Sequence, residues 1–276
     1  FTLDTDATLI ETDKNTARMC YKGFSAFAPL LSFLAELDLC VAGEFRNGNV
    51  PAGVGIVGQL KSTHKLLTSL GKRLRYFRSD SAGYQAEIIN TCCKLGVKFT
   101  ITADQDAAVK AVIRRAVTEG RWRRVFNRSG KRTDRCYATA VHCMEKTKAF
   151  TLVIQRWPNP NPDLFTQEPY CYQVIATNDD DRDPQKLIWF HNGRGDAENN
   201  NKELKLGFGM DYMPCRNLRA DSVWLELGIL AHNLTVDVKR LLLGGEWATK
   251  TIATLRWQLI SIAGKLVRHG RWLYLK

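Results

Sequence analysis

The chain has 276 residues, which at about 150 residues per domain allows one large domain or two small ones. Hydrophobic residues make up 45% and charged residues 25%, a globular composition that excludes a disordered chain, collagen-like repeats and a disulfide-stapled miniprotein. The formal net charge of +12 favours a polyanionic partner, nucleic acid first and an anionic membrane surface second.

The sequence also bears on location. No uncharged apolar run approaches the roughly 18 residues that a membrane-spanning helix requires, and no signal peptide is recognisable. The eight cysteines include no C-x-x-C pair, which indicates reduced cytosolic thiols and neither a zinc site nor a disulfide frame. We therefore expect a soluble cytoplasmic protein. Because the chain begins at Phe1, without Met and inside a strand-like run, we expect a fragment that lacks its N-terminal region.

The first hundred residues predict alternating strands and helices. Apolar and polar side chains alternate over residues 2–10 with the period of two of a strand. The runs that follow predict strands at 29–35 and 37–45, a helix at 51–70, a strand at 74–80, a helix at 84–95 and a strand at 97–101. The order βββαβαβ predicts an α/β fold with a five-stranded mixed sheet flanked by helices.

The pattern changes after residue 104. A basic segment comes first, and strand-like runs at 150–156 and 170–177 follow around a Pro/Asn-rich loop at 157–162. Residues 105–186 therefore look like an inserted, partly β subdomain. This insertion would interrupt one discontinuous domain, made of residues 1–104 and 187–276, with helices at 196–206 and 222–243 and a basic C-terminal tail.

The positive charge is concentrated in two segments. Residues 105–135 and 239–276 each carry a net charge of +7, which leaves −2 for the rest of the chain. Aromatic residues interleave with the cations, a mixture suited to phosphate contact and base stacking. A solvated helix face with a few core aromatics is the alternative for either segment. The DNA-binding candidates are Arg121, Trp122, Arg123 and Arg124 in the first segment and Arg268 and Arg271 in the second.

Three acids are candidates for a metal site. Hard cations such as Mg²⁺ prefer carboxylate oxygens, and two such ions can activate an attacking oxygen and stabilise a leaving one. Asp4 and Asp6 share a face of the first predicted strand, and only one of them need be a ligand. Asp80 ends the fourth strand, beside a Gly83 turn. For each acid, a turn residue or helix N-cap is the alternative.

The third acid comes from a predicted helix. At 100° per residue, Arg194, Lys202 and Lys205 lie within 40° of Glu198 and form one stripe with it. Asp196 and Glu203 fall on the other side, so Glu198 is the acid of this helix that would face a site. An exposed helix with an ordinary Arg194–Glu198 pair is the alternative.

The motifs that contain these residues resemble those of a known family. The spacing His191-x2-Arg194-x3-Glu198-x6-Lys205 resembles the Y-x2-R-x3-E-x6-K signature of bacterial insertion-sequence DDE transposases, and the residues around it resemble the DDE-domain group 1 transposases. Leu3-Asp4-x-Asp6-Ala7-Thr8 and Arg78-x-Asp80-Ser81-Ala82-Gly83-Tyr84 are similar to the first and second acid motifs of this group. The match extends over nearly the whole chain. His191 departs from it by replacing the tyrosine, although a histidine can still donate a hydrogen bond to phosphate.

The resemblance implies a fold and a catalytic site. The fold is ribonuclease H-like, in agreement with the predicted element order. The resemblance implies Asp6, Asp80 and Glu198 as catalytic and metal-binding residues, with Asp6 favoured over Asp4 because the family's acid lies in a D-x-T setting. The implied cofactor is a pair of Mg²⁺ ions, for which Mn²⁺ can substitute. Arg194 and Lys205 would contact DNA phosphates, and Lys202 and His191 are further DNA-binding candidates.

The resemblance also implies partners. These are double-stranded DNA, as transposon ends and as target, and a second copy of the chain in the active complex, in a bacterial cytoplasm at the nucleoid and away from membranes. Asp80 and Glu198 are 118 residues apart, and similar transposases carry an insertion there that helps to hold DNA. Trp122 or Trp157 would stack on a displaced base in this interpretation, and a core tryptophan is the alternative.

The main hypothesis is therefore a DNA transposase that performs metal-dependent cleavage at insertion-sequence ends and transfers the 3′-OH strand into target DNA. A catalytically inactive, truncated transposase that only binds DNA is the alternative. A resolvase or a ribonuclease on the same fold would share the acids but would not explain the R-E-K spacing.

Overall fold

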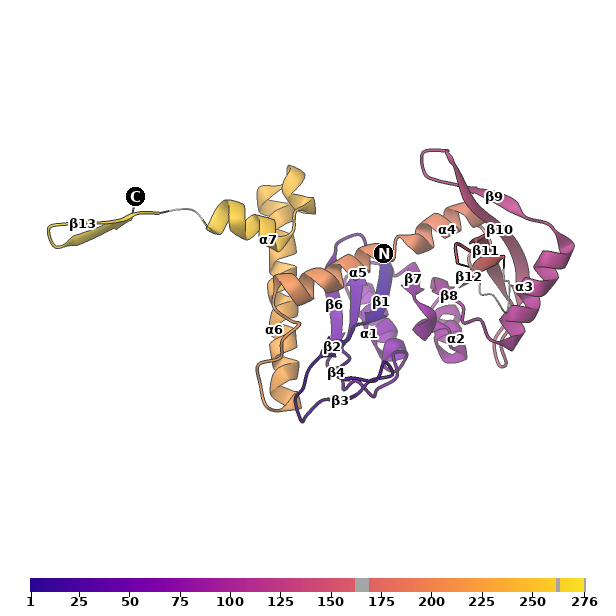
Figure 1. Ribbon diagram of the computed structural model, residues 1–276, viewed down its shortest axis with the longest axis horizontal. Coiled ribbons are helices and arrows are strands. Elements are labelled where there is room, and N and C mark those ends of the chain that lie inside the picture. The colour runs from indigo at the N-terminus through magenta and orange to yellow at the C-terminus, as the bar shows by residue number, and fades with distance from the viewer. Residues whose placement is uncertain (162–168, 262–263, 276) are drawn as a thin grey trace.

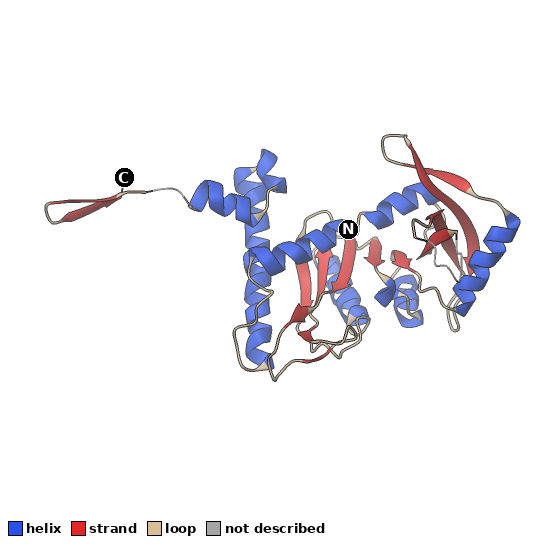
Figure 2. Ribbon diagram, in the orientation of Figure 1, coloured by secondary structure: helices blue, strands red, loops and turns tan. Residues whose placement is uncertain are grey.

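The computed structural model describes residues 1–161, 169–261 and 264–275 (Figures 1 and 2). Its centre is a nine-stranded mixed sheet with the strand order β6-β5-β1-β7-β8-β12-β11-β10-β9. The strands of this sheet are β1 (Thr2–Ala7), β5 (Leu30–Leu34), β6 (Leu39–Glu44), β7 (Tyr76–Ser79), β8 (Lys98–Thr102), β9 (Arg123–Phe126), β10 (Arg132–His142), β11 (Phe150–Pro158) and β12 (Tyr170–Thr177).

The first five of these strands have the predicted arrangement. β5 pairs antiparallel with β1 and β6, whereas β1, β7 and β8 are parallel neighbours. Parallel neighbours need crossover connections, which helices α1 (Ile56–Ser69) and α2 (Ala86–Lys94) supply. The structure thus confirms the ribonuclease H-like α/β fold, and these strands lie within the predicted ranges except at Thr102.

One face of the sheet buries the main core. Leu3 of β1, Phe77 of β7 and Phe99 of β8 pack there with Leu60 of α1 and Ile88 of α2. Helix α3 (Ala107–Glu119), which lies inside the first basic segment, packs against the same core. Because side chains alternate across a strand, the positions between these residues point to the opposite face.

The opposite face is covered by the C-terminal helices. α6 (Leu218–Asp237) packs Leu225 and Ile229 against Phe33 of β5. α4 (Pro184–Asn192) and α5 (Gly195–Lys202) cross this face, as Figure 2 shows. The predicted helix at 196–206 is therefore α5 followed by a π-helical turn, Glu203–Gly207, and the predicted helix at 222–243 is α6 followed by a π-helical segment, Val238–Leu243.

The strands of segment 105–186 extend the same sheet, which therefore has nine strands and not the predicted five. β9 to β12 are antiparallel neighbours, and β12 pairs antiparallel with β8 through Ile175–Thr102, Ala176–Ile101 and Thr177–Thr100. α4 packs Leu187 and Ile188 on the outer strands. The loop predicted at 157–162 lies partly outside the described residues.

Smaller elements complete the chain. They are a three-stranded sheet of β2 (Ile10–Glu11), β3 (Arg18–Met19) and β4 (Ser25–Phe27), the 3₁₀ turns Ser81–Gly83 and Gly245–Thr249, α7 (Ile252–Leu255), the π turn Arg256–Ile260, and the hairpin of β13 (Leu266–His269) and β14 (Trp272–Leu275). The predicted basic tail thus contains a helix and a hairpin, and Figure 1 shows the hairpin projecting from the body. In the part of the chain that the structure describes, no helix has the length and apolarity needed to cross a membrane.

Candidate active site

Two of the three predicted acids lie at the ends of neighbouring strands. β1 and β7 run parallel with Thr5 opposite Ser79, so Asp6 and Asp80 come next on each strand at the same edge of the sheet. Asp80 also caps the turn after β7, where its Oδ1 accepts a hydrogen bond from the Ala82 amide at 3.1 Å. The N-cap interpretation of Asp80 is therefore correct, and it is compatible with a position beside Asp6.

The turn after Asp80 requires a glycine. A Cβ at Gly83 would lie 2.7 Å from both Cβ and Oγ of Ser79, closer than side-chain atoms approach. The glycine therefore lets the chain fold back tightly over the end of β7.

The third acid, Glu198 of α5, is linked to Asp6 through an arginine and a shared pocket. The Arg194 guanidinium lies between two carboxylates, with Nη2 2.6 Å from Glu198 Oε1 and Nη1 3.9 Å from Asp6 Oδ1. Asp6 Oδ2 accepts a hydrogen bond from Asn201 Nδ2 at 3.0 Å. Glu198 and Asp6 line one pocket of about 260 Å³, together with Thr8, Asn201, Lys202, Lys205 and Leu206.

The pKa of Asp6 is affected by both of the other acids. Burial, followed by the carboxylate of Asp80, raises the pKa of Asp6 to about 6, and Glu198 acts in the same direction. Arg194 and the Asn201 hydrogen bond oppose this rise. A carboxylate whose charge is incompletely compensated is a place where an added cation is favoured.

The donor set fits a hard divalent cation, because all three candidate ligands offer carboxylate oxygens. As the side chains stand in residues 1–161, 169–261 and 264–275, no three His, Cys, Asp or Glu groups are close enough together to hold a metal ion. In this arrangement Arg194 is the cation beside Asp6 and Glu198.

Asp4 has a different environment from Asp6. It is 1% exposed and accepts two hydrogen bonds at 2.6 Å from Nε and Nη2 of Arg78, whose Nη1 donates to the Phe190 carbonyl at 2.6 Å. The carboxylate of Asp4 thus joins β1 to β7 and, through Arg78, to α4. Its oxygens are committed to this pair.

The structure does not support His191 as a DNA contact. The side chain is 2% exposed, with its ring nitrogens 3.0 Å from Thr102 Oγ1 and 3.2 Å from Thr100 Oγ1 on β8. Burial, followed by the charges of Arg194 and Arg78, lowers the pKa of His191 to about 3. His191 is therefore a neutral core residue that packs α4 on the sheet, and phosphate cannot reach it.

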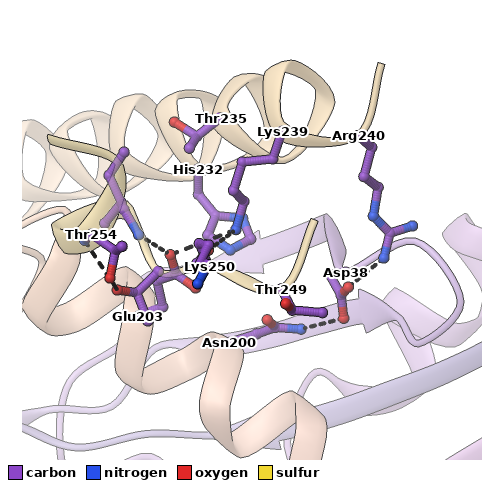
Figure 3. Close-up of polar contacts among 12 residues, drawn as sticks. Asp38, Asn200, Glu203, His232, Thr235, Lys239, Arg240, Thr249, Lys250 and Thr254 are labelled. Atoms are coloured by element: carbon purple, nitrogen blue, oxygen red, sulfur yellow. Dashed lines mark hydrogen bonds and ion pairs between the residues drawn. The ribbon is translucent and has the colours of Figure 1, made fainter. Parts of the chain in front are cut away.

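The two lysines of the predicted stripe do face the pocket with Glu198. Lys202 is exposed, and Lys205 is half-buried with its Nζ donating to the Leu9 carbonyl at 2.7 Å. The other side of this helix contacts the C-terminal segment. Glu203 Oε1 accepts a hydrogen bond from the Ile252 amide at 2.7 Å. The same oxygen lies 3.9 Å from Lys239 Nζ, and Figure 3 shows Glu203 and Lys239 facing each other. Glu203 thus points away from Glu198, as its helical angle predicts.

The basic candidates outside this helix divide into exposed and packed residues. The five arginines (Arg121, Arg123, Arg124, Arg268 and Arg271) are exposed. Trp122 is half-buried against the main core, and the Arg156 guanidinium lies 3.9 Å over its ring. Trp157 is similarly covered by Arg135 at 4.3 Å. These contacts favour the core interpretation of Trp122 over a base-stacking role.

Sequence reasoning missed two residues that shape the site. Asn201 lies about 60° from Glu198 on a helical projection and holds Asp6, so extending the stripe by one position would have included it. Arg78 belongs to the second acid motif, which by itself indicates no role for it. Arg78 and Asp4 lie on the same face of the sheet, and only the parallel pairing of β1 with β7 reveals this.

Comparisons with known proteins agree with the motifs. The family model described as Transposase DDE domain group 1 matches residues 1–276. A solved piggyBac transposase, in a synaptic complex with hairpin DNA, aligns at 10% sequence identity and a TM-score of 0.48, covering 95% of this chain and 55% of that chain. The chain therefore spans about half the length of that transposase. No match was found among curated proteins. Since the family model covers the whole chain, this protein belongs to the Transposase DDE domain group 1 family.

Proposed function

We propose that this chain is a DNA transposase that cuts DNA at the ends of an insertion sequence and joins the freed 3′-OH to target DNA. The observation that carries the proposal is the position of Asp6, which shares a pocket with Glu198 and lies on the strand beside the one that ends at Asp80. The three acids come from β1, the end of β7 and α5, and the carboxylates of Asp80 and Glu198 both act to raise the pKa of Asp6. Membership of a transposase family supports the same reaction class.

The three carboxylates would hold divalent cations, Mg²⁺ or in its place Mn²⁺. When bound, such ions activate the attacking oxygen and stabilise the leaving oxygen of a phosphodiester. Asn201 orients Asp6 through its hydrogen bond, and the capped turn orients Asp80. Asp4 and Arg78 fix the two strands that present these acids.

The side chains around the acids suit a DNA backbone. Arg194, Lys202 and Lys205 place three positive charges on the pocket side of α5 and its π turn, where they would neutralise phosphates on either side of the cleaved bond. The exposed arginines of the two basic segments would bind duplex DNA further from the acids. We further propose that two copies act together on a pair of ends, in a bacterial cytoplasm at the nucleoid.

Replacing Glu198 tests the proposal. Glu198→Gln keeps the size of the side chain and removes the charge, so it should lower Mg²⁺-dependent nicking of a duplex that carries the element's terminal repeat by more than about 100-fold, beyond the cost of losing a supporting contact. DNA binding should change little, because the change leaves the three basic side chains in place. The measurements are nicking rate on a denaturing gel and affinity by fluorescence anisotropy.

Asp196→Asn is the matched control. Asp196 is an exposed acid of the same helix, on the side away from Asp6, and its loss should leave nicking unchanged. Nicking that survives Glu198→Gln would refute the assignment of Glu198. A wild-type chain that binds the duplex tightly and does not nick it with Mg²⁺ or Mn²⁺ would instead establish the alternative, an inactive DNA-binding protein.

A further inference from the structure

Helix α6 carries apolar side chains on two opposite faces. One face packs Leu225 and Ile229 against the sheet. No part of the described chain covers the opposite face, where three leucines and a valine are between 54% and 64% exposed. We call this surface the α6 stripe; it consists of Val223, Leu227, Leu230 and Leu234. A contiguous exposed apolar patch on a helix that already buries its other face is typical of a protein interaction surface, which indicates that a partner covers the stripe.

The spacing of the stripe fits another helix. Its residues follow each other at intervals of four, three and four, the alternation that places side chains along a single seam between two helices. At 1.5 Å per residue the four positions extend over about 16 Å. A partner helix with the same alternation would interdigitate with it, and a second α6 has that alternation.

The charges at the two ends of the stripe select the orientation. Arg219 and Asp237 are both exposed and both lie about 40° from Val223 on a helical projection, in line with the stripe. When two α6 helices run antiparallel about the midpoint of the stripe, Arg219 of each copy meets Asp237 of the other within one residue. A parallel pair would instead bring like charges together at both ends, which is unfavourable. Within one helix the two residues are about 27 Å apart and do not pair.

We infer that the α6 stripe is an interface between two copies of this chain, in which their α6 helices pack antiparallel about a two-fold axis. The same patch then serves both copies, as in isologous dimers. The inference rests on the two-copy part of the proposed function and names its surface. Its test measures the oligomeric state without any DNA cleavage. A chain that nicks DNA as a monomer would therefore overturn the interface and leave the proposed catalytic site in place.

A charge swap tests the orientation. Sedimentation equilibrium should show a wild-type dimer at micromolar concentrations. Arg219→Asp alone or Asp237→Arg alone should raise the dimer dissociation constant roughly tenfold, since each change turns two attractive pairs into repulsive ones. The double variant restores opposite charges between copies and should return the constant to near the wild-type value. No recovery in the double variant would overturn the antiparallel arrangement.

A leucine substitution tests the surface itself. Leu230→Glu places a charge in the centre of the seam and should raise the dissociation constant more than about 100-fold. The side chain is 64% exposed, so circular dichroism and thermal unfolding should show an intact fold. Leu66→Glu, at a leucine of α1 that is 45% exposed, is the control and should leave the dimer unchanged.

Three outcomes would overturn the inference: a monomeric wild-type chain, a dimer that Leu230→Glu does not weaken, or a monomer that binds vesicles of anionic phospholipid through the stripe. The last outcome would show that a lipid surface, and not a second α6 helix, covers the stripe.

Discussion

Asp4 and Asp6 lie two residues apart on one face of β1 and have different surroundings. Asp4 is paired with Arg78 on both oxygens, whereas Asp6 has the amide of Asn201, the more distant Arg194 and two neighbouring acids. A fully paired carboxylate gains little from another cation, and a poorly compensated one gains much. The division of roles between the two aspartates therefore follows from their partners.

The burial of His191 predicts how stability depends on pH. Its pKa is about 3 in the folded chain and about 6.5 when unfolded, so between these values the unfolded chain binds one more proton. Stability should therefore fall as pH falls through this window, with His191 contributing about 1.4 kcal/mol per pH unit. His191→Gln removes that contribution, so its urea unfolding free energy should decline less steeply between pH 6.5 and pH 4.

His269→Gln is the control for this prediction, because His269 is exposed in the β13–β14 hairpin. It should keep the wild-type pH dependence. A His191→Gln variant whose pH dependence equals that of the wild type would show that folding does not lower the pKa of His191.

At the scale of elements, the joint between α4 and α5 sets where Glu198 lies. Gly193 follows α4, and a Cβ there would lie 2.5 Å from Arg78 Nη1, the atom that bonds to the Phe190 carbonyl. Gly193→Ala should therefore displace Arg78 and lower the unfolding free energy by about 1–3 kcal/mol, the usual cost of overpacking. Chemical denaturation measures the change.

Gly195 provides the matched comparison, two residues further on. A Cβ there meets nothing within 4 Å, and the residue begins α5, so Gly195→Ala should leave stability unchanged or raise it by up to about 1 kcal/mol. Equal losses in the two variants would mean that the contact with Arg78 is not what makes Gly193 necessary.

These elements also show what local sequence patterns can predict. Apolar alternation predicts β1, and a helical repeat places Glu198 opposite Asp196, because both depend on residues close in the chain. The burial of His191 depends on α4 packing against β8, 90 residues away along the chain, and no local period encodes that contact. The pairing of β12 with β8 is equally non-local, so the sequence predicts strands in the insertion but not the nine-stranded sheet that they complete.

At the scale of the molecule, the basic segments lie at opposite ends, with α5 between them. Figure 1 shows the insertion at one end and the β13–β14 hairpin at the other. This separation predicts that each segment contributes its own phosphate contacts. Replacing Arg121, Arg123 and Arg124 by Gln should reduce the slope of log affinity against log salt by about 2.7 for duplex DNA, since each contact contributes about 0.9.

Anisotropy titrations at several NaCl concentrations measure that slope. A triple replacement of Lys61, Lys65 and Lys72 by Gln removes the same charge from exposed positions on α1 and just after it, on the side of the sheet away from Asp6. It should leave the slope unchanged. A smaller slope in both variants, by the same amount, would show that DNA senses only the net charge of the chain.

The pairing of β12 with β8 has a consequence for mechanics and for engineering. β8 is also the parallel neighbour of β7, the strand that ends at Asp80, so the outer strands and the acid share one ladder of backbone hydrogen bonds. A pull on the outer strands is therefore transmitted to the end of β7 without a flexible tether. A chimaera in which residues 105–186 come from a relative must keep the pairing that Ile175, Ala176 and Thr177 make with β8. Without this pairing the sheet will open at β8, one strand away from the strand that ends at Asp80.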